Sequence, residues 1–197
     1  KTKIAALGSK LSYEKYLPFG QPNFYREIEE ITASGSEAVL ISLVGQDAVE
    51  FNRNFGALNA HETMIRLSCA IEENALLASG SDGLKRLFSS SSYFASLKSE
   101  QNAAFKEKYY TLHGDRAPML NALGQSTYEG IQFLKELIQT HGQSWADFGM
   151  PRREPLIYKS VRNSKFVSND QKSSPIYLAR ADGVLYSVDK KLVKTMD

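Results

Sequence analysis

The stretch Ala38-Val39-Leu40-Ile41-Ser42-Leu43-Val44 decides the fold class. It is an almost unbroken apolar run that is too short for a helix of ordinary length. A strand with one face in water alternates apolar and polar residues, whereas a strand covered on both faces does not. We therefore predict that residues 38–44 form a central, buried strand of a parallel sheet.

Segments on both sides of this run show strand and helix patterns in turn. Upstream, residues 10–17 alternate as a strand does, and a helix capped by Asn23 would place Phe24, Ile28 and Ile31 on one face. Strands that alternate with helices predict βαβ units around a parallel sheet. Downstream, the patterns predict a helix after Asp47, a strand at 64–68, a helix at 71–78, a strand at 83–88, a helix at 99–112 closed by Gly114, and a helix at 121–140 ended by Gly142.

The chain turns β-rich beyond Trp145. Asp182-Gly183 between two alternating runs is a strong hairpin signal, so Tyr177 and Tyr186 should lie on neighbouring antiparallel strands. The predicted fold class is α/β, with an open, mostly parallel sheet, flanking helices and antiparallel C-terminal strands. The strand patterns in this region occupy residues 156–161, 165–167, 176–179 and 184–188.

The first residues of the chain also have a helical pattern. Residues 1–7 have the spacing of the last turns of a helix, and Gly8 is placed to end it. Two interpretations stay open: the chain is a fragment of a longer protein, or it begins with an ordinary short helix.

Composition excludes several classes of partner. Lys and Arg number 24 against 22 Asp and Glu, and the charges are interspersed, so no field of one sign is present to attract nucleic acid. No apolar run approaches the roughly 20 residues that span a bilayer, which predicts no membrane insertion. The single cysteine cannot close an internal disulfide, and it leaves the redox compartment undetermined.

The sequence offers no set of residues with the spacing of a catalytic or metal site. His61, His113 and His141 are scattered and have no partner at zinc spacing. No glycine-rich stretch completes a dinucleotide or phosphate loop, and the serine run 89–92 lacks a nucleophile elbow. We therefore predict that the protein is not an enzyme and holds no metal or cofactor.

An α/β enzyme is the alternative hypothesis. It would use Cys69 or Ser68 as nucleophile and Glu72 as acid or base. However, Cys69 follows an apolar strand and has no basic neighbour in sequence, which is more typical of a small buried hydrophobic residue.

The ends of the predicted strands are the expected ligand site. Open parallel sheets bind ligands in the crevice outside the carboxyl ends of their strands. These ends fall at Gly45-Gln46-Asp47, at residues 68–72 and at residues 91–94. Asp47 either forms a capping box with Glu50 or accepts a hydrogen bond from an amide of the ligand.

Several motifs, taken in order, resemble the type I periplasmic-binding-protein family. They are the strand ends above, Tyr16-Leu17-Pro18-Phe19-Gly20, Ile65-Arg66-Leu67-Ser68, Tyr93-Phe94 before a helix, and residues 123–130. The resemblance covers most of the chain, which looks like the second half of such a protein. Within the family it looks most like the urea- and short-chain-amide-binding components of ABC uptake systems and the amide-sensing regulators of amidase operons.

The resemblance implies an organisation and a set of ligand contacts. Family members build two lobes around a cleft, so residues 1–94 would belong to the second lobe, 95–150 would be helices packed on the first lobe, and 151–197 would return to the second lobe. Ser68 and the backbone N–H of Ile71 would face the ligand from a helix N-terminus, and Glu72 would balance a cationic ligand or stabilise the first helical turn. The implied contacts are Gly45, Asp47, Ser68, Cys69, Ala70, Ile71, Glu72 and Tyr93.

The resemblance also implies a function and partners. The chain would bind a small polar solute, such as an amide, urea or an amino acid, and work with an ABC transporter permease or a regulatory protein. A transporter component would be extracytoplasmic, and a regulator would be cytoplasmic. An apolar stripe at helical spacing should pack on the missing first lobe or on another copy of the chain; its members are Leu120, Leu123, Thr127, Ile131, Leu134 and Ile138.

Overall fold

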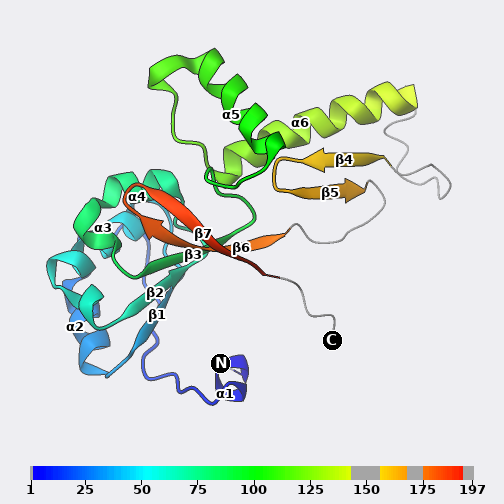
Figure 1. Ribbon diagram of the computed structural model, residues 1–197. Coiled ribbons are helices and arrows are strands. Elements are labelled where there is room, and N and C mark those ends of the chain that lie inside the picture. The colour runs from blue at the N-terminus through cyan, green and yellow to red at the C-terminus, as the bar shows by residue number, and fades with distance from the viewer. Residues whose placement is uncertain (1, 143–155, 168–174, 193–197) are drawn as a thin grey trace. The chain divides into compact units, whose positions relative to one another are not determined.

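The computed structural model describes residues 2–142, 156–167 and 175–192 (Figure 1). These residues fall into two compact units. The first unit comprises residues 1–90 and 179–187, and the second comprises residues 91–178 and 188–197.

Helices and strands alternate through the first unit, as the sequence predicts. The α-helices are α1 (Thr2–Ala6), α2 (Tyr25–Ala33), α3 (Gly45–Ala57), α4 (Glu73–Ser79), α5 (Glu100–His113) and α6 (Ala122–His141), and the 3-10 helices are η1 (Ala60–Glu62), η2 (Ser81–Leu84) and η3 (Gly114–Arg116). The strands are β1 (Ala38–Ile41), β2 (Ile65–Ser68), β3 (Leu87–Ser91), β4 (Ile157–Ser160), β5 (Ser164–Val167), β6 (Ile176–Asp182) and β7 (Leu185–Leu192).

The main sheet confirms the predicted α/β class. Its strand order is β1-β2-β3-β6-β7, and β1, β2 and β3 pair in parallel. Only two residues join β6 to β7, so these neighbours run antiparallel and the hairpin across Asp182-Gly183 is confirmed. Strands β4 and β5 form a separate antiparallel pair.

One face of the parallel strands carries the core of the first unit. Along β2, Arg66 and Ser68 are buried, whereas Ile65 and Leu67 on the opposite face are exposed. Helices α2 and α3 lie beside β1 and β2 in Figure 1. The buried core cluster consists of Phe24, Ile28, Ile31, Ile41, Phe51, Phe55, Ala60 and Met64.

The predicted central position of residues 38–44 is wrong. Strand β1 ends at Ile41 and lies at one edge of the described sheet, and Leu40 is 69% exposed. The predicted burial of both faces is also wrong, since Ala38 and Leu40 are exposed and only Ile41 of β1 is buried. An apolar run carries no information about whether both backbone edges of a strand are paired. The parallel pairing itself is confirmed by the register Ile41 with Ser68.

The strand predicted at residues 10–17 is also absent from the described part of the chain. Tyr13 and Leu17 are partly buried against the core cluster. The alternating pattern therefore reflects side-chain burial in an extended segment that is not hydrogen-bonded to a neighbouring strand.

The structure corrects two predicted helix caps. Helix α2 begins after Phe24, whose backbone N–H donates to Asn54 Oδ1 at 2.8 Å, so the first turn is capped by a side chain of α3 and not by Asn23. Helix α3 begins at Gly45, which places Asp47 inside the first turn instead of at the start of a capping box.

The strand predicted at residues 83–88 begins later, at Leu87, because Gly83 belongs to η2. A Cβ atom at Gly83 would lie 2.6 Å from the backbone oxygen of Asn52 in α3. The contact between η2 and α3 is therefore close enough to require glycine.

We expect Gly83→Ala to lower the free energy of unfolding by roughly 1–3 kcal/mol, since backbone must move to admit the methyl group. Gly130→Ala is the matched control, because no atom lies within 4 Å of its added Cβ inside α6. The control should leave stability unchanged or raise it by about 0.5–1 kcal/mol. Urea unfolding followed by circular dichroism measures both; equal effects of the two substitutions would contradict the close contact.

Candidate functional site

The ends of β1 and β2 meet at one edge of the sheet. Because β1 and β2 are parallel and Ile41 pairs with Ser68, the segments that leave these strands start side by side. We refer to residues 42–47 and 68–72 as the strand-exit edge. Seven of the eight predicted ligand contacts lie on it, all within the first unit.

The N-terminus of α3 faces this edge without a side-chain cap. Its N-cap residue is Val44, which makes no capping hydrogen bond, and Gly45 is exposed. Gly45 has φ 59°, a left-handed conformation in which glycine turns the chain from β1 into the helix. The first backbone N–H groups of a helix have no partner inside the helix, and they carry partial positive charge. This end of α3 can therefore bind an anionic or carbonyl oxygen.

Asp47 fastens a neighbouring turn to the start of α3. Its side chain is buried, and its Oδ2 accepts the backbone N–H of Gly20 at 3.0 Å. The structure therefore gives this carboxylate a partner within the chain. Its contact with a ligand stays a prediction.

The loop after β2 is held in place by three hydrogen bonds. Ser68 Oγ accepts the backbone N–H of Ala70 at 3.1 Å. The carbonyl oxygen of Ile71 accepts hydrogen bonds from Ser89 Oγ at 3.1 Å and from the Tyr186 hydroxyl at 2.9 Å. Burial raises the pKa of Tyr186, so its hydroxyl remains a donor across the physiological pH range.

Two predictions about this loop are wrong. Cys69 is exposed and not buried, because it follows Ser68, whose side chain points into the core, and therefore takes the opposite side of the chain. Helix α4 begins at Glu73 with Glu72 as N-cap, so the N–H of Ile71 is not part of its first turn. Ile71 instead contributes a buried side chain and a carbonyl oxygen that accepts two hydrogen bonds.

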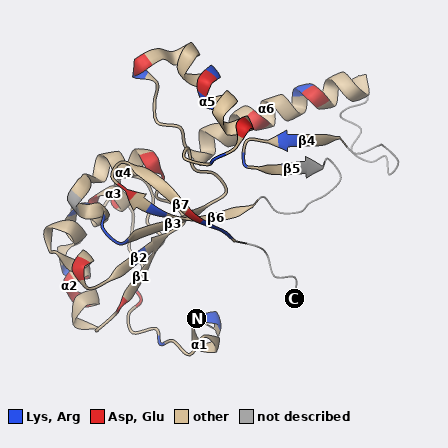
Figure 2. Cartoon of the chain, in the orientation of Figure 1, with Lys and Arg blue, Asp and Glu red and all other residues tan. Residues whose placement is uncertain are grey.

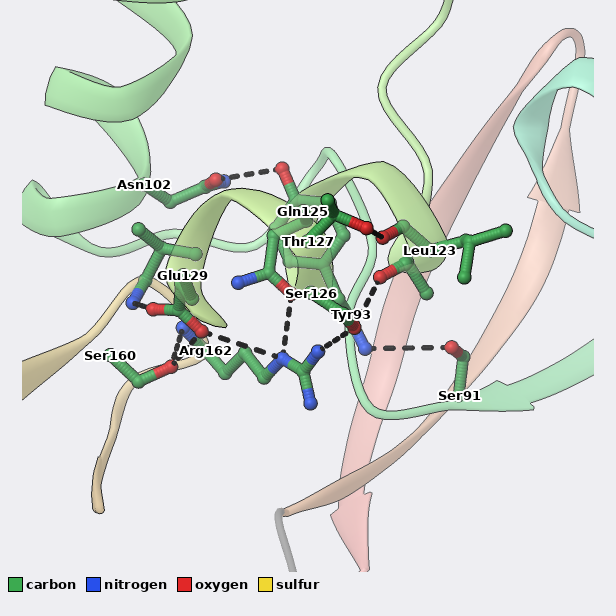
Figure 3. Close-up of polar contacts among 12 residues, drawn as sticks. Ser91, Tyr93, Asn102, Leu123, Gln125, Ser126, Thr127, Glu129, Ser160 and Arg162 are labelled. Carbon is green, nitrogen blue, oxygen red and sulfur yellow. Dashed lines mark hydrogen bonds and ion pairs between the residues drawn. The ribbon is translucent and has the colours of Figure 1, made fainter. Parts of the chain in front are cut away.

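Tyr93, the eighth predicted contact, belongs to the second unit. It is buried, and its hydroxyl donates to Asn102 Oδ1 at 2.9 Å. Asn102 Nδ2 in turn donates to the carbonyl oxygen of Leu97 at 2.8 Å. The phenol group is thus part of a hydrogen-bonded chain that holds the segment before α5 (Figure 3).

Sequence reasoning missed a buried polar cluster around Arg162 in the second unit (Figure 3). Arg162 Nε donates to Gln125 Oε1 at 2.7 Å, and its guanidinium also bonds the Ser126 hydroxyl. Glu129 accepts the Ser160 hydroxyl at 2.9 Å and the backbone N–H of Val161 at 2.7 Å. The cluster therefore ties the turn between β4 and β5 to α6.

The Arg162 cluster is held by charge as well as by hydrogen bonds. Arg162 Nε lies 3.8 Å from Glu129 Oε2, and both side chains are buried. Burial lowers the pKa of Arg162 while the nearby carboxylate opposes that shift. The sequence signal was the pair Gln125 and Glu129, four residues apart and therefore on the same side of α6.

A second buried arginine, Arg66 of β2, lies in the core of the first unit. Its two terminal nitrogens donate to Asn52 Oδ1 and to the carbonyl oxygen of Lys85, both at 2.6 Å. The guanidinium lies 4.4 Å from the centre of the Phe55 ring. Burial lowers its pKa to about 10, so Arg66 stays charged at neutral pH and is balanced by neutral acceptors and an aromatic face.

Among the described residues, no three His, Cys, Asp or Glu side chains gather as a metal site would require. In the same part of the chain, no helix combines the length and apolar character needed to span a membrane.

An open parallel sheet with a helix N-terminus at a strand exit is the architecture of an α/β ligand-binding lobe. A family model described as periplasmic binding protein matches residues 1–183, so the chain belongs to that family. The family resemblance of the sequence is therefore confirmed. No curated protein matches the chain.

Solved structures with the same fold are type I solute-binding proteins of ABC transporters. One, from Rhodopseudomonas palustris, is in complex with 4-hydroxybenzoate; it is 17% identical with a TM-score of 0.76, and the match covers 97% of this chain and 54% of that protein. An amino acid ABC transporter substrate-binding protein from Pseudomonas fluorescens Pf-5 is 13% identical with a TM-score of 0.78. The match covers 100% of this chain and 55% of that protein. A leucine-binding protein from Thermotoga maritima is 14% identical with a TM-score of 0.69. The match covers 97% of this chain and 54% of that protein.

The chain thus spans about half the length of the solved structures that it matches. None of these three structures singles out the urea and amide branch that the sequence resembles.

We expect Glu129→Ala to lower the free energy of unfolding by about 3 kcal/mol, because it leaves the Ser160 hydroxyl and the Val161 N–H without their acceptor and the buried Arg162 guanidinium without its nearby carboxylate. Lys135→Ala removes an exposed charge from the same helix and should change stability by less than about 0.5 kcal/mol. Chemical denaturation of the two variants checks this. A loss below about 1 kcal/mol for Glu129→Ala would show that the cluster is not an important source of stability.

Proposed function

We propose that the chain is one half of a solute-binding protein that captures a small polar solute for uptake by an ABC transporter, without chemistry of its own. The family match over residues 1–183 supports the binding role. The uncapped, exposed start of α3, next to the loop held by Ser68 and Ile71, carries the proposal for the site.

The first-turn N–H groups of α3 are the proposed partners of an oxygen atom of the solute. Amides and urea offer a carbonyl oxygen, and amino acids offer a carboxylate. The solved relatives are described with 4-hydroxybenzoate, benzoate or valine bound, each of which has a carboxylate. A carboxylate gains most from the partial positive charge of a helix N-terminus, which favours the amino acid among the three predicted solutes.

Side chains of the loop after β2 are the proposed source of specificity. Cys69 is exposed, and Ala70 and Glu72 are half-buried. The family resemblance implies a hydroxyl where Ala70 stands, so this position offers the solute a methyl group in place of a hydrogen-bond donor. The buried Ser68 and Tyr93 would act by holding their segments, since each already has a hydrogen-bond partner in the chain.

The whole protein would contain a second lobe that closes over the solute. We propose that residues 1–90 and 179–187 belong to the lobe with the strand-exit edge, and that α5 and α6 pack on the other lobe together with the β4–β5 pair, whose turn the Arg162 cluster ties to α6. Residues 1, 143–155, 168–174 and 193–197 lie outside the described residues. The complete protein would be extracytoplasmic and would deliver its solute to a permease.

The exposed apolar face of α6 is an argument that another part of the whole protein covers this helix. Leu123 is 73% exposed and Ile131 is 62% exposed, and Leu134 and Ile138 continue the same face. Leu120 of the predicted stripe is buried within the chain. An apolar face of this kind is a liability in water, so we propose that the other lobe covers it.

The isolated chain should bind solutes weakly, because half a cleft leaves one side of the ligand in water. We expect dissociation constants in the millimolar range or weaker for leucine, valine, 4-hydroxybenzoate, acetamide and urea, measured by calorimetry. Micromolar binding of any of them by the chain alone would contradict the half-cleft.

Amide chemical shifts in NMR titrations test the location and the carboxylate preference together. Leucine should shift the backbone amides of Gly45, Gln46 and Ala70, and leucinamide should shift them several-fold less, because it lacks the carboxylate. Equal shifts for both compounds would contradict the carboxylate contact. Shifts confined to other parts of the chain would overturn the proposed site.

Sedimentation velocity tests the apolar face of α6. We expect the chain to self-associate at micromolar concentration and Leu134→Glu to restore the monomer, because a buried charge opposes apolar contact. Gln139→Glu adds the same charge at an exposed position on another side of the helix and should leave association unchanged. A monomeric wild-type chain would show that this face needs no cover.

A further inference from the structure

Three consecutive carbonyl oxygens in the turn between β4 and β5 accept hydrogen bonds from distant side chains of the second unit. We refer to residues 161–163 as the anchor turn, and each of its carbonyl groups has a different donor. The pairs, with the acceptor first, are Val161 with Ser99 Oγ at 3.2 Å, Arg162 with the Tyr177 hydroxyl at 2.6 Å, and Asn163 with Lys191 Nζ at 3.4 Å. One short turn is therefore joined to three other parts of the chain.

The backbone of the anchor turn makes these oxygens available. Ser160 and Ser164 are the last residues that pair across β4 and β5, so residues 161–163 form a three-residue hairpin loop outside the ladder. Asn163 has φ 55°, a left-handed conformation that asparagine adopts more readily than most residues. Val161 and Arg162 are buried, and buried carbonyl groups require hydrogen-bond donors. The loop obtains those donors from side chains elsewhere in the unit.

The donors are linked to the three connections between the two units. The chain passes from one unit to the other after Ser90, after Leu178 and after Ser187. Tyr177 lies just before the second crossing, and Lys191 lies shortly after the third. The anchor turn therefore holds two of the connections directly.

A series of hydrogen bonds holds the first connection. Tyr93, shortly after the first crossing, donates its hydroxyl to Asn102 Oδ1 at 2.9 Å (Figure 3). The backbone N–H of Asn102 donates to Ser99 Oγ at 3.1 Å, and the Ser99 hydroxyl in turn donates to the carbonyl oxygen of Val161. All three connections are therefore held, directly or in series, by the same turn.

Helix α6 supports the anchor turn. The Arg162 side chain bonds Gln125 and Ser126, and Glu129 accepts the backbone N–H of Val161. Arg162 and Glu129 also bring a basic residue of the turn next to an acidic residue of α6, the two charge types that Figure 2 shows in blue and red. Because α6 is a continuous helix of 20 residues, it gives the turn a stiff base.

We propose that the anchor turn is a positioning element that fixes the second-unit ends of all three connections, and that Arg162 holds this turn on α6. Movement of one unit relative to the other then bends the chain on the first-unit side of Tyr93, Tyr177 and Lys191, while the anchored ends keep their places. Strands β6 and β7 are neighbours and continue across their crossings, so they bend together as one hairpin. The inference does not depend on whether a solute binds.

Spin labels on the two units measure how closely the anchor turn restricts them. The natural cysteine, Cys69, is exposed in the first unit, and Lys108→Cys adds one exposed cysteine on α5. Leu134→Glu is included in every sample to keep the chain monomeric. Pulsed electron paramagnetic resonance gives the distribution of label-to-label distances, which we expect to be narrow when the anchor turn is intact. A broad distribution in that sample would overturn the proposal.

Two tyrosine substitutions supply the matched test. Tyr177→Phe removes the hydroxyl that holds β6 to Arg162, and it should widen the distance distribution by about twofold or more. Tyr109→Phe also removes a tyrosine–carbonyl hydrogen bond of the second unit, to Pro118 at 2.9 Å, but Tyr109 lies within α5 and not on a connection. This control should leave the width unchanged. Equal widths in the two variants would contradict the anchor role of the turn.

A further pair separates positioning from a simple loss of stability. Arg162→Met frees the turn from α6, and the variant should widen the distribution at least as much as Tyr177→Phe in samples that circular dichroism shows to be folded. Gly83→Ala acts in the first unit, away from the anchor turn, and should lower stability without widening the distribution. If Gly83→Ala widens it as much as Arg162→Met, the width follows stability and the proposal is wrong. If Arg162→Met does not fold, the two tyrosine variants decide.

Discussion

The packing of α2 and α3 on one face of the sheet is the constraint on which the candidate site depends. Phe51 lies with its ring centre 5.6 Å from that of Phe24 and 5.7 Å from that of Phe55. A buried phenylalanine contributes about 1.5–3 kcal/mol, so this cluster is a large share of the stability of a small unit. Because only three residues separate Ile41 of β1 from α3, the same packing fixes where the helix N-terminus lies.

Buried hydrogen bonds fix the position of the loop after β2. The carbonyl of Ile71 is held by Ser89 of β3 and by Tyr186 of β7, so strands distant in sequence set the position of a single loop residue. A buried acceptor with two donors would cost several kcal/mol to leave unpaired, which restricts the loop to one conformation. Rigid positioning of backbone groups is what the proposed solute site would require.

The sequence predicts the helices and strands of this fold better than it predicts strand pairing, helix caps and long-range side-chain contacts. Among the described residues, periodicity located the six α-helices and the C-terminal hairpin, and it missed the three 3-10 helices. It cannot report hydrogen bonding across a strand edge, which is why β1 was predicted as central and residues 10–17 as a strand. Helix caps such as Asn54 on Phe24, and the cluster of Arg162 with Glu129, join residues about 30 apart and become visible only in three dimensions.

The proposed site has a weak sequence signature because much of it is backbone. Every residue except proline carries an N–H group, so the first turn of α3 offers the same donors whatever its side chains are. Selection for solute binding would then act on turn geometry, as at Gly45, and on the few exposed side chains of the adjacent loop. In the proposed site, Cys69 and Ala70 would influence the preferred solute without any change in the packing that holds α3 and β2.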